Sequence, residues 1–177
     1  MSTSTTVPVG SFGAAFGDID YADPDFEALR SRSDEIVPFG KHVGTTITVL
    51  TPEHAIVEIS GEASGMNHMG TVHAGAIYTA ADIAGAAAFV GAAATKLNTI
   101  ERLVLKSATA SYRKPAMGVL RTVATVDERE LRVITSSVST GRHDISAKAV
   151  VLNADDVTVA KFTFEYVCDV VHGEVVR

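Results

Sequence analysis

The sequence has a single cysteine and a deficit of basic residues. Cys168 alone excludes an internal disulfide framework, and its place near the end of an apolar run predicts a core or interface residue. Fifteen Lys and Arg against 21 Asp and Glu give a formal net charge of −6. Nucleic-acid binding needs a basic face, so this balance argues against nucleic-acid partners but leaves room for a small anionic ligand.

The sequence also gives no sign of a secretory signal or of a membrane-spanning segment. The N-terminus, MSTSTTVPVGSFGAAFGD, has no basic start followed by an apolar run, so no secretory signal is expected. Residues 74–94 are long enough to raise the question of a membrane span. They are mostly Ala and Gly with Asp82 in their middle and no flanking aromatic belts, which argues against a span. We therefore expect a cytoplasmic protein without a membrane partner.

The first part of the chain predicts a flexible segment and then a helix. Residues 1–20 are rich in Ser, Thr and Gly and are expected to be flexible, whereas residues 21–177 are expected to form one domain. Asp23 before Pro24 is typical of a helix start, with Asp as the N-cap. The predicted helix covers residues 25–37.

The remaining elements indicate an α+β fold. Residues 74–94 predict one long helix that is apolar on every side, so an antiparallel sheet must wrap around it. Residues 128–139 are ambiguous, and their first half favours a helix. The sheet is expected to have about five or six strands, predicted at 42–50, 55–59, 103–112, 118–126, 144–152 and 157–167.

Asp82 is the only charged residue of the long apolar helix. A carboxylate there is costly to bury unless it is hydrogen-bonded or used, and taken alone a structural and a catalytic role are equally compatible with it. Asn67 and His73 lie just before the helix, where the first N–H groups have no partner and favour negative charge. A carboxylate together with such a corner predicts a catalytic site.

These residues resemble a known family. The pattern Asn-x5-His-Ala-Gly with an acid nine residues after the His is similar to the hotdog fold, and more narrowly to acyl-CoA thioesterases of the phenylacetate-pathway and 4-hydroxybenzoyl-CoA type. The resemblance covers roughly residues 38–167. One departure is that Ala74 stands where the family usually has Gly, which bears on substrate fit more than on chemistry. The matching positions are Asn67, Gly70, His73, Gly75 and Asp82.

The resemblance implies hydrolysis of an acyl-CoA, or a related acyl thioester, to a free acid and a thiol. Asp82 would act as base or nucleophile, and the backbone N–H of Ala74 would stabilise the oxyanion. His73 would shape the turn or hold the thioester, and Asn67 would orient water or a neighbouring group. No cofactor is expected apart from coenzyme A as part of the substrate. Candidates for substrate binding are Gly75, Tyr78, Arg113 and Lys114.

The spacing of the two catalytic groups predicts a homodimer. Ala74 and Asp82 are eight residues apart, which is about 12 Å along a helix. A donor and a base that act on one carbonyl must both lie within roughly 3 Å of the reacting atoms. Asp82 of one subunit must therefore meet Ala74 of another across a two-fold interface. A dimer of dimers stays open.

Other readings of these residues have less support. His68 and His73 do not have a usual metal-ligand spacing, so no metal is expected, and Ser64 lacks the context of a nucleophile elbow. Tyr78 is also compatible with simple packing, and strand-edge cations are also compatible with plain solvation. A hotdog protein that binds an acyl or aromatic ligand without turnover remains the main alternative. Hotdog dehydratase or hydratase chemistry is less favoured, because its motifs are not evident.

Overall fold

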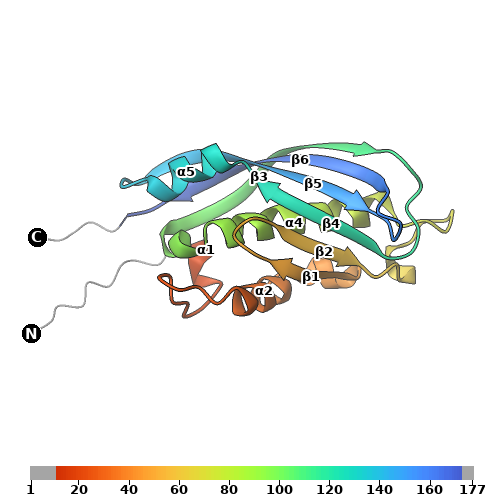
Figure 1. The fold of residues 1–177 in the computed structure, drawn as a ribbon, viewed down its shortest axis with the longest axis horizontal. Helices are drawn as coiled ribbons and strands as arrows, with labels where there is room; N and C mark the ends of the chain where they lie inside the picture. Colours follow the sequence, from red (N-terminus) through yellow and green to blue (C-terminus); the bar gives the residue numbers. More distant parts are fainter. Residues whose placement is uncertain (1–10, 173–177) are drawn as a thin grey trace, which may run out of the picture.

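The computed structural model describes residues 11–172 and shows one antiparallel sheet curved around a long helix (Figure 1). The strand order is β1-β2-β4-β5-β6-β3, and the central helix is α4 (Ala74–Ala92). This confirms the predicted α+β hotdog architecture. The strands are β1 (Thr45–Leu50), β2 (Ala55–Ile59), β3 (Ile100–Tyr112), β4 (Leu120–Val126), β5 (Gly141–Leu152) and β6 (Thr158–Val170).

Small side chains allow α4 to lie close to its neighbours. A Cβ added at Gly91 would lie 2.2 Å from the carbonyl oxygen of Thr51, and one added at Gly85 would lie 2.6 Å from the hydroxyl of Tyr166. Most residues of α4 are buried. By length and composition α4 could cross a membrane, but a buried core helix passes the same test. Its place inside the curved sheet accounts for its apolar composition.

The strands lie near the predicted ranges, but β1 begins at Thr45 and β4 at Leu120, later than the predicted residues 42 and 118. The β1–β2 hairpin is present, and β2 has the predicted bounds. β3, β5 and β6 each extend a few residues beyond the prediction, because their first or last residues continue the ladder past the apolar stretch. Cys168 is buried on β6, as expected.

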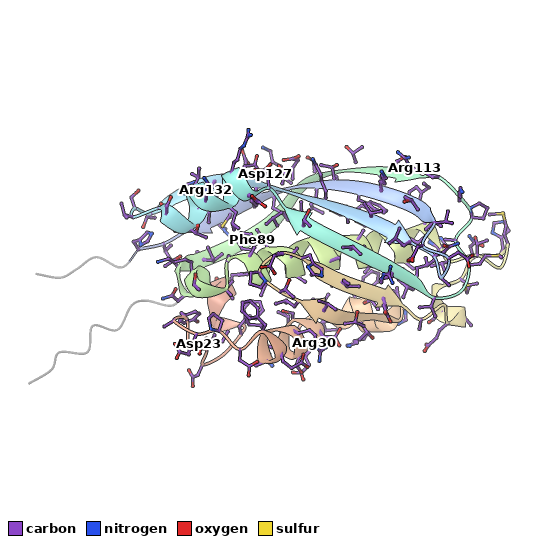
Figure 2. All side chains as sticks on the ribbon, in the orientation of Figure 1. Asp23, Arg30, Phe89, Arg113, Asp127 and Arg132 are labelled. Carbon is purple, nitrogen blue, oxygen red and sulfur yellow. The ribbon has the colours of Figure 1, made fainter. Side chains whose placement is uncertain are left out.

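The N-terminal elements differ most from expectation. Within the segment expected to be flexible, residues 11–14 form α1 (Ser11–Ala14), and Phe16 after it is buried in the core. The rings of Phe12 and Phe89 pack edge to face. Figure 2 places Phe89 near the end of α4. The aromatic side chains therefore anchor this stretch despite its Gly- and Ser-rich neighbours. Residues 1–10 lie outside the described part of the chain.

The helix predicted over 25–37 is shorter and is capped by a different residue. α2 (Phe26–Glu35) begins after Asp25, whose carboxylate accepts hydrogen bonds from two first-turn N–H groups. Asp23 was the wrong cap, because Pro24 lies before the helix and not in its first turn. Pro38 starts a further short helix, α3 (Pro38–His42), as proline does well at a first helical position.

The ambiguous segment forms a helix, as its first half favours. α5 (Glu128–Ser136) is capped by Asp127 and packs against β5. Glu130 fixes it there, because its carboxylate accepts hydrogen bonds from the backbone N–H and the hydroxyl of Ser146 on β5. Ser146 points outward, since its neighbour Ala147 is buried on the α4 side.

Candidate active site

The start of α4 offers hydrogen-bond donors, and we call this place the donor corner. His73 is the N-cap, and its Nδ1 accepts a hydrogen bond of 2.9 Å from the N–H of Gly75. An Nδ1 that accepts is unprotonated, so the neutral ring carries its proton on Nε2, which is then a second donor. Among residues 11–172, no group accepts a hydrogen bond from the N–H of Ala74. This donor is therefore available to an oxygen atom outside the helix.

Asn67 holds the loop that leads to this corner. Its side-chain oxygen accepts hydrogen bonds from the N–H groups of Met69 and Thr71, and its Nδ2 donates to the Thr71 hydroxyl. After this loop, the N–H of His73 donates to the carbonyl of Gly65. In this structure Asn67 thus orients its own loop and positions His73 through it.

A cavity of about 470 Å³ opens beside the helix start. Tyr78 also lines it, and its ring packs edge-on against Phe162 and Phe164. Tyr78 therefore has a clear packing role as well as a place in the cavity wall. The other lining residues are Phe39, Val43, Ser64, Gly65, Met66, His73, Gly75, Ala76 and Thr79.

Two turns along α4, Asp82 is held by a tyrosine from the sheet. The hydroxyl of Tyr166 on β6 donates to Oδ1 of Asp82 at 3.1 Å, and its oxygen also lies 3.3 Å from the Asp82 carbonyl. The bond to Tyr166 is the one hydrogen bond that the Asp82 carboxylate forms in the described chain, and the side chain is half-buried. One carboxylate oxygen is thus fixed and the other is free to take a proton or attack a carbonyl.

Burial raises the pKa of the Asp82 carboxyl above its ordinary value, and the hydrogen bond from Tyr166 offsets part of this rise. Burial and the nearby Asp82 charge raise the pKa of Tyr166, so its hydroxyl stays protonated and always donates. A carboxylate whose pKa is raised in this way is a stronger base than an exposed aspartate.

If Asp82 acts as a base, the rate of the reaction that it assists falls at low pH, where its carboxyl is protonated. Removing the Tyr166 hydroxyl should then move this acid limb of the pH–rate profile. In Tyr166→Phe the carboxylate loses its hydrogen bond, so the pKa of Asp82 rises further and the ionised form appears only at higher pH. We expect the acid limb of kcat/KM to shift upward by about one pH unit, since a hydrogen bond to a charged group contributes roughly 1.5 kcal/mol or more. Tyr21→Phe is the control and should leave the limb in place, because the Asp82 carboxylate bonds to Tyr166 alone among residues 11–172. If the limb does not shift in Tyr166→Phe, ionisation of Asp82 is not the cause of the pH dependence.

Tyr166 was not singled out from the sequence, although a signal was present. Phe162, Phe164 and Tyr166 alternate along β6, so all three face α4. Only the last carries a hydroxyl, and a buried tyrosine hydroxyl generally has a partner. Gly85 leaves room for it, because any larger side chain would displace the hydroxyl.

The predicted cations lie near the same end of the fold as the helix start. Arg113 and Lys114 follow β3 directly, and Figure 2 places Arg113 at that end. The last residue of β3, Tyr112, donates its hydroxyl to the carbonyl of Ala74 at 3.1 Å. Both cations are exposed, and neither forms an ion pair within residues 11–172. By contrast, Arg102 is paired with Asp169.

The structure brings some predicted residues together and keeps others apart. Gly75, Tyr78 and His73 share the cavity at the start of α4. Asp82 instead lines a second cavity with residues of α1 and α2. The described residues contain no group of three metal-ligating side chains. One chain therefore has a donor corner and a carboxylate at separate places.

The chain belongs to the family described as domain of unknown function DUF4442, whose model matches residues 27–167. No protein of curated function matches the chain. Among solved structures, a Pseudomonas aeruginosa protein described as of unknown function and a probable thioesterase has a TM-score of 0.69 at 24% identity, covering 82% of this chain and 96% of its own.

Two further structures have the same fold. A Chlorobaculum tepidum protein of unknown function has a TM-score of 0.68 at 19% identity, covering 81% of this chain and 93% of its own. A Haemophilus influenzae thioesterase has a TM-score of 0.63 at 14% identity, covering 85% and 92%. At identities this low, the structural similarity establishes the shared hotdog fold alone. The activity has to be argued from the site.

Proposed function

We propose that the protein is a thioesterase that hydrolyses an acyl-CoA, or a related acyl thioester, to a free acid and a thiol. The observation that carries the proposal is Asp82, a lone carboxylate in the core helix that is fixed by Tyr166 and faces a cavity. A half-buried acid without a cation is costly to keep, and its use as a base or nucleophile accounts for it. The thioesterase names of two structures with the same fold agree with this chemistry.

The reaction needs negative charge to be stabilised on the carbonyl oxygen. The free N–H of Ala74 lies at the positive end of the α4 dipole and suits this role, and His73 Nε2 is a second donor beside it. Asp82 either takes a proton from water, which adds to the carbonyl carbon, or attacks that carbon itself and forms an anhydride that water then opens. In both routes the carbon–sulfur bond breaks and the thiol leaves with a proton.

The catalytic groups of two chains must combine, because about 12 Å of helix separates Ala74 from Asp82 within one chain. β3 offers the surface for such a dimer. It ends the sheet, and from Lys106 to Tyr112 it is exposed on both faces. Val104 and Tyr112 on it are 50% and 47% exposed. A long unpaired edge with apolar side chains promotes aggregation unless another strand covers it, and β3 of a second copy would do so.

The first test is a thiol-release assay with short, long and aromatic acyl-CoA substrates. We expect hydrolysis of at least one class. Absence of hydrolysis for every member, together with binding of the same thioesters, would instead favour a hotdog protein that holds its ligand without turnover.

Mixing two inactive variants tests the shared site. Asp82→Asn removes the carboxylate, and Ala74→Pro removes the N–H. In a mixed dimer one site lacks both groups and the other has both, so random mixing should restore about a quarter of the wild-type rate. The variants are denatured together, refolded and assayed, with each variant refolded alone as the control. Failure to recover activity, with mixed dimers shown by mass spectrometry, would contradict a site shared between subunits.

A further inference from the structure

Tyr112 ties the end of the edge strand β3 to the start of α4, and both lie at the same end of the fold (Figure 1). Its hydroxyl donates to the carbonyl oxygen of Ala74 at 3.1 Å. This is the one hydrogen bond between β3 and α4 within residues 11–172. A carbonyl oxygen has two lone pairs, so it accepts this bond beside the ordinary bond of the helix. The first peptide group inside α4 is therefore held from the sheet.

The hydrogen bonding continues through that peptide group to the His73 ring. The carbonyl of Ala74 and the N–H of Gly75 belong to the same planar peptide group. The carbonyl oxygen accepts from Tyr112, and the N–H donates to Nδ1 of His73 at 2.9 Å. Hydrogen bonds in such a chain polarise one another, so a bond to the carbonyl oxygen makes the N–H on the other side a better donor. Tyr112 therefore strengthens the hydrogen bond that His73 accepts.

The tautomer of His73 depends on this hydrogen bond. A ring nitrogen that accepts a hydrogen bond carries no proton, and the proton of the neutral ring then lies on the other nitrogen. The bond from Gly75 therefore favours the ring with its proton on Nε2. His73 and Gly75 both line the cavity at the donor corner. The tautomer thus decides whether the ring offers that cavity a donor at Nε2 or an acceptor.

The position of Tyr112 is set by the sheet. β3 pairs with β6, and the residue after Tyr112, Arg113, donates its N–H to the carbonyl of Val159 at 2.8 Å. The ring of Tyr112 packs edge-on against Phe162, with 5.6 Å between the ring centroids. Partial burial and the nearby Tyr78 raise the pKa of Tyr112 above its ordinary value, so its hydroxyl stays protonated and donates. A donor held in this way is preorganised for the helix start.

We propose that Tyr112 is a positioning residue of the donor corner, which acts through the Ala74–Gly75 peptide to keep His73 in the tautomer with its proton on Nε2. The catalytic part of this inference rests on the proposed thioesterase function, in which this Nε2–H is a second donor to the oxyanion. A ring with its proton on Nδ1 has a lone pair at Nε2 instead, and a lone pair repels the oxyanion.

Nitrogen NMR of histidine-labelled protein without substrate tests the tautomer, at about pH 8 where an ordinary imidazole is neutral. Tyr112→Phe removes the hydroxyl and keeps a ring to pack against Phe162. In the wild type we expect an unprotonated Nδ1 and a protonated Nε2 at His73, whose signals are identified by their loss in His73→Ser. In Tyr112→Phe the two signals should move toward each other, because part of the population carries its proton on Nδ1. The control Tyr21→Phe should leave them in place.

Two results of this measurement would overturn the proposal. The first is a wild-type His73 ring with its proton on Nδ1. The second is a pair of His73 signals that does not change between the wild type and Tyr112→Phe.

Kinetics test whether the tautomer matters to the reaction. In Tyr112→Phe we expect kcat to fall about threefold with KM nearly unchanged, since the donor acts on the transition state. The acid limb of the pH–rate profile should stay in place, in contrast to Tyr166→Phe, because the hydrogen bond to Asp82 is intact. An unchanged kcat, or a shifted acid limb, would contradict a role at the donor corner.

A double-mutant cycle with His73→Ser shows whether Tyr112 acts through His73. Serine is a good N-cap, so the helix start is kept while the ring and its Nε2–H are lost. In the His73→Ser background, Tyr112→Phe should cause no further loss of kcat, because no ring remains to be held. Equal losses of kcat with and without His73 would overturn the proposal.

The NMR measurement separates this proposal from the thioesterase function, because it needs no turnover. If no thioester is hydrolysed but the His73 signals respond to Tyr112→Phe, the positioning role stands and the enzymatic function fails. If hydrolysis occurs but neither the His73 signals nor kcat respond to Tyr112→Phe, the thioesterase stands and the positioning role fails.

Discussion

Asp82→Asn is expected to abolish hydrolysis and at the same time stabilise the fold. Asparagine cannot take a proton from water or form an anhydride, so the rate should fall by about 10²–10⁴-fold. The amide is close to the carboxylate in shape, and its oxygen still accepts the hydrogen bond from Tyr166. The position therefore keeps its packing and loses its charge.

The stability change has a definite pH dependence. Burial raises the pKa of Asp82 in the folded protein, so between the unfolded and folded pKa values the folded state binds more protons. Asp82 therefore does not lower the free energy of unfolding of the wild type below the unfolded pKa, about 4. The free energy of unfolding falls as the pH rises from there through the folded pKa. Asparagine does not titrate, so its advantage in melting temperature should grow across this range and level off above it.

Thermal melts from pH 4 to 8, with rates measured on the same preparations, check both effects. Asp155→Asn, an exposed acid in the turn between β5 and β6, should change neither the rate nor the pH dependence of the melting temperature. A well-folded Asp82→Asn that still hydrolyses its substrate would remove Asp82 from the mechanism. A large drop in its melting temperature would instead indicate a structural carboxylate.

The core of the fold is readable from the sequence because its pattern is local. The uncharged residues of α4 and the alternation along the strands each indicate their own element, and the Asp82 position follows from them. The packing of Phe12 and Phe16 is not local. Nothing in a Gly- and Ser-rich segment shows that the ring of Phe12 packs against Phe16 and against Phe89, which lies far along the chain.

The same distinction applies to the site. His73 caps the helix that directly follows it, so its role is visible in the sequence. Tyr166 reaches Asp82 only through the fold, from β6. Tyr112 reaches Ala74 in the same way, from the end of β3. Pairings over such separations depend on strand order and helix docking, which periodicity alone does not specify.

Ala74→Pro is expected to remove the oxyanion donor with little effect on the fold. Ala74 is the first residue of α4, where proline is well tolerated because that N–H has no partner within the helix. A proline also restricts the residue before it to extended conformations. His73 already has φ −62° and ψ 137°, which meets this requirement. The substitution thus deletes one N–H and leaves the backbone path unchanged.

Loss of one oxyanion donor typically lowers kcat by about 10²–10³-fold. Ala74→Pro should show this loss with a melting temperature close to that of the wild type, and Ala74→Ser, which retains the N–H, should keep most of the rate. Because the donor acts on the transition state, kcat should fall more than KM rises. Full activity in Ala74→Pro would place the oxyanion elsewhere, with the Nε2–H of His73 as the remaining donor at this corner. Together with the refolded mixture of Ala74→Pro and Asp82→Asn, this result decides whether the donor and the carboxylate serve one carbonyl across two chains.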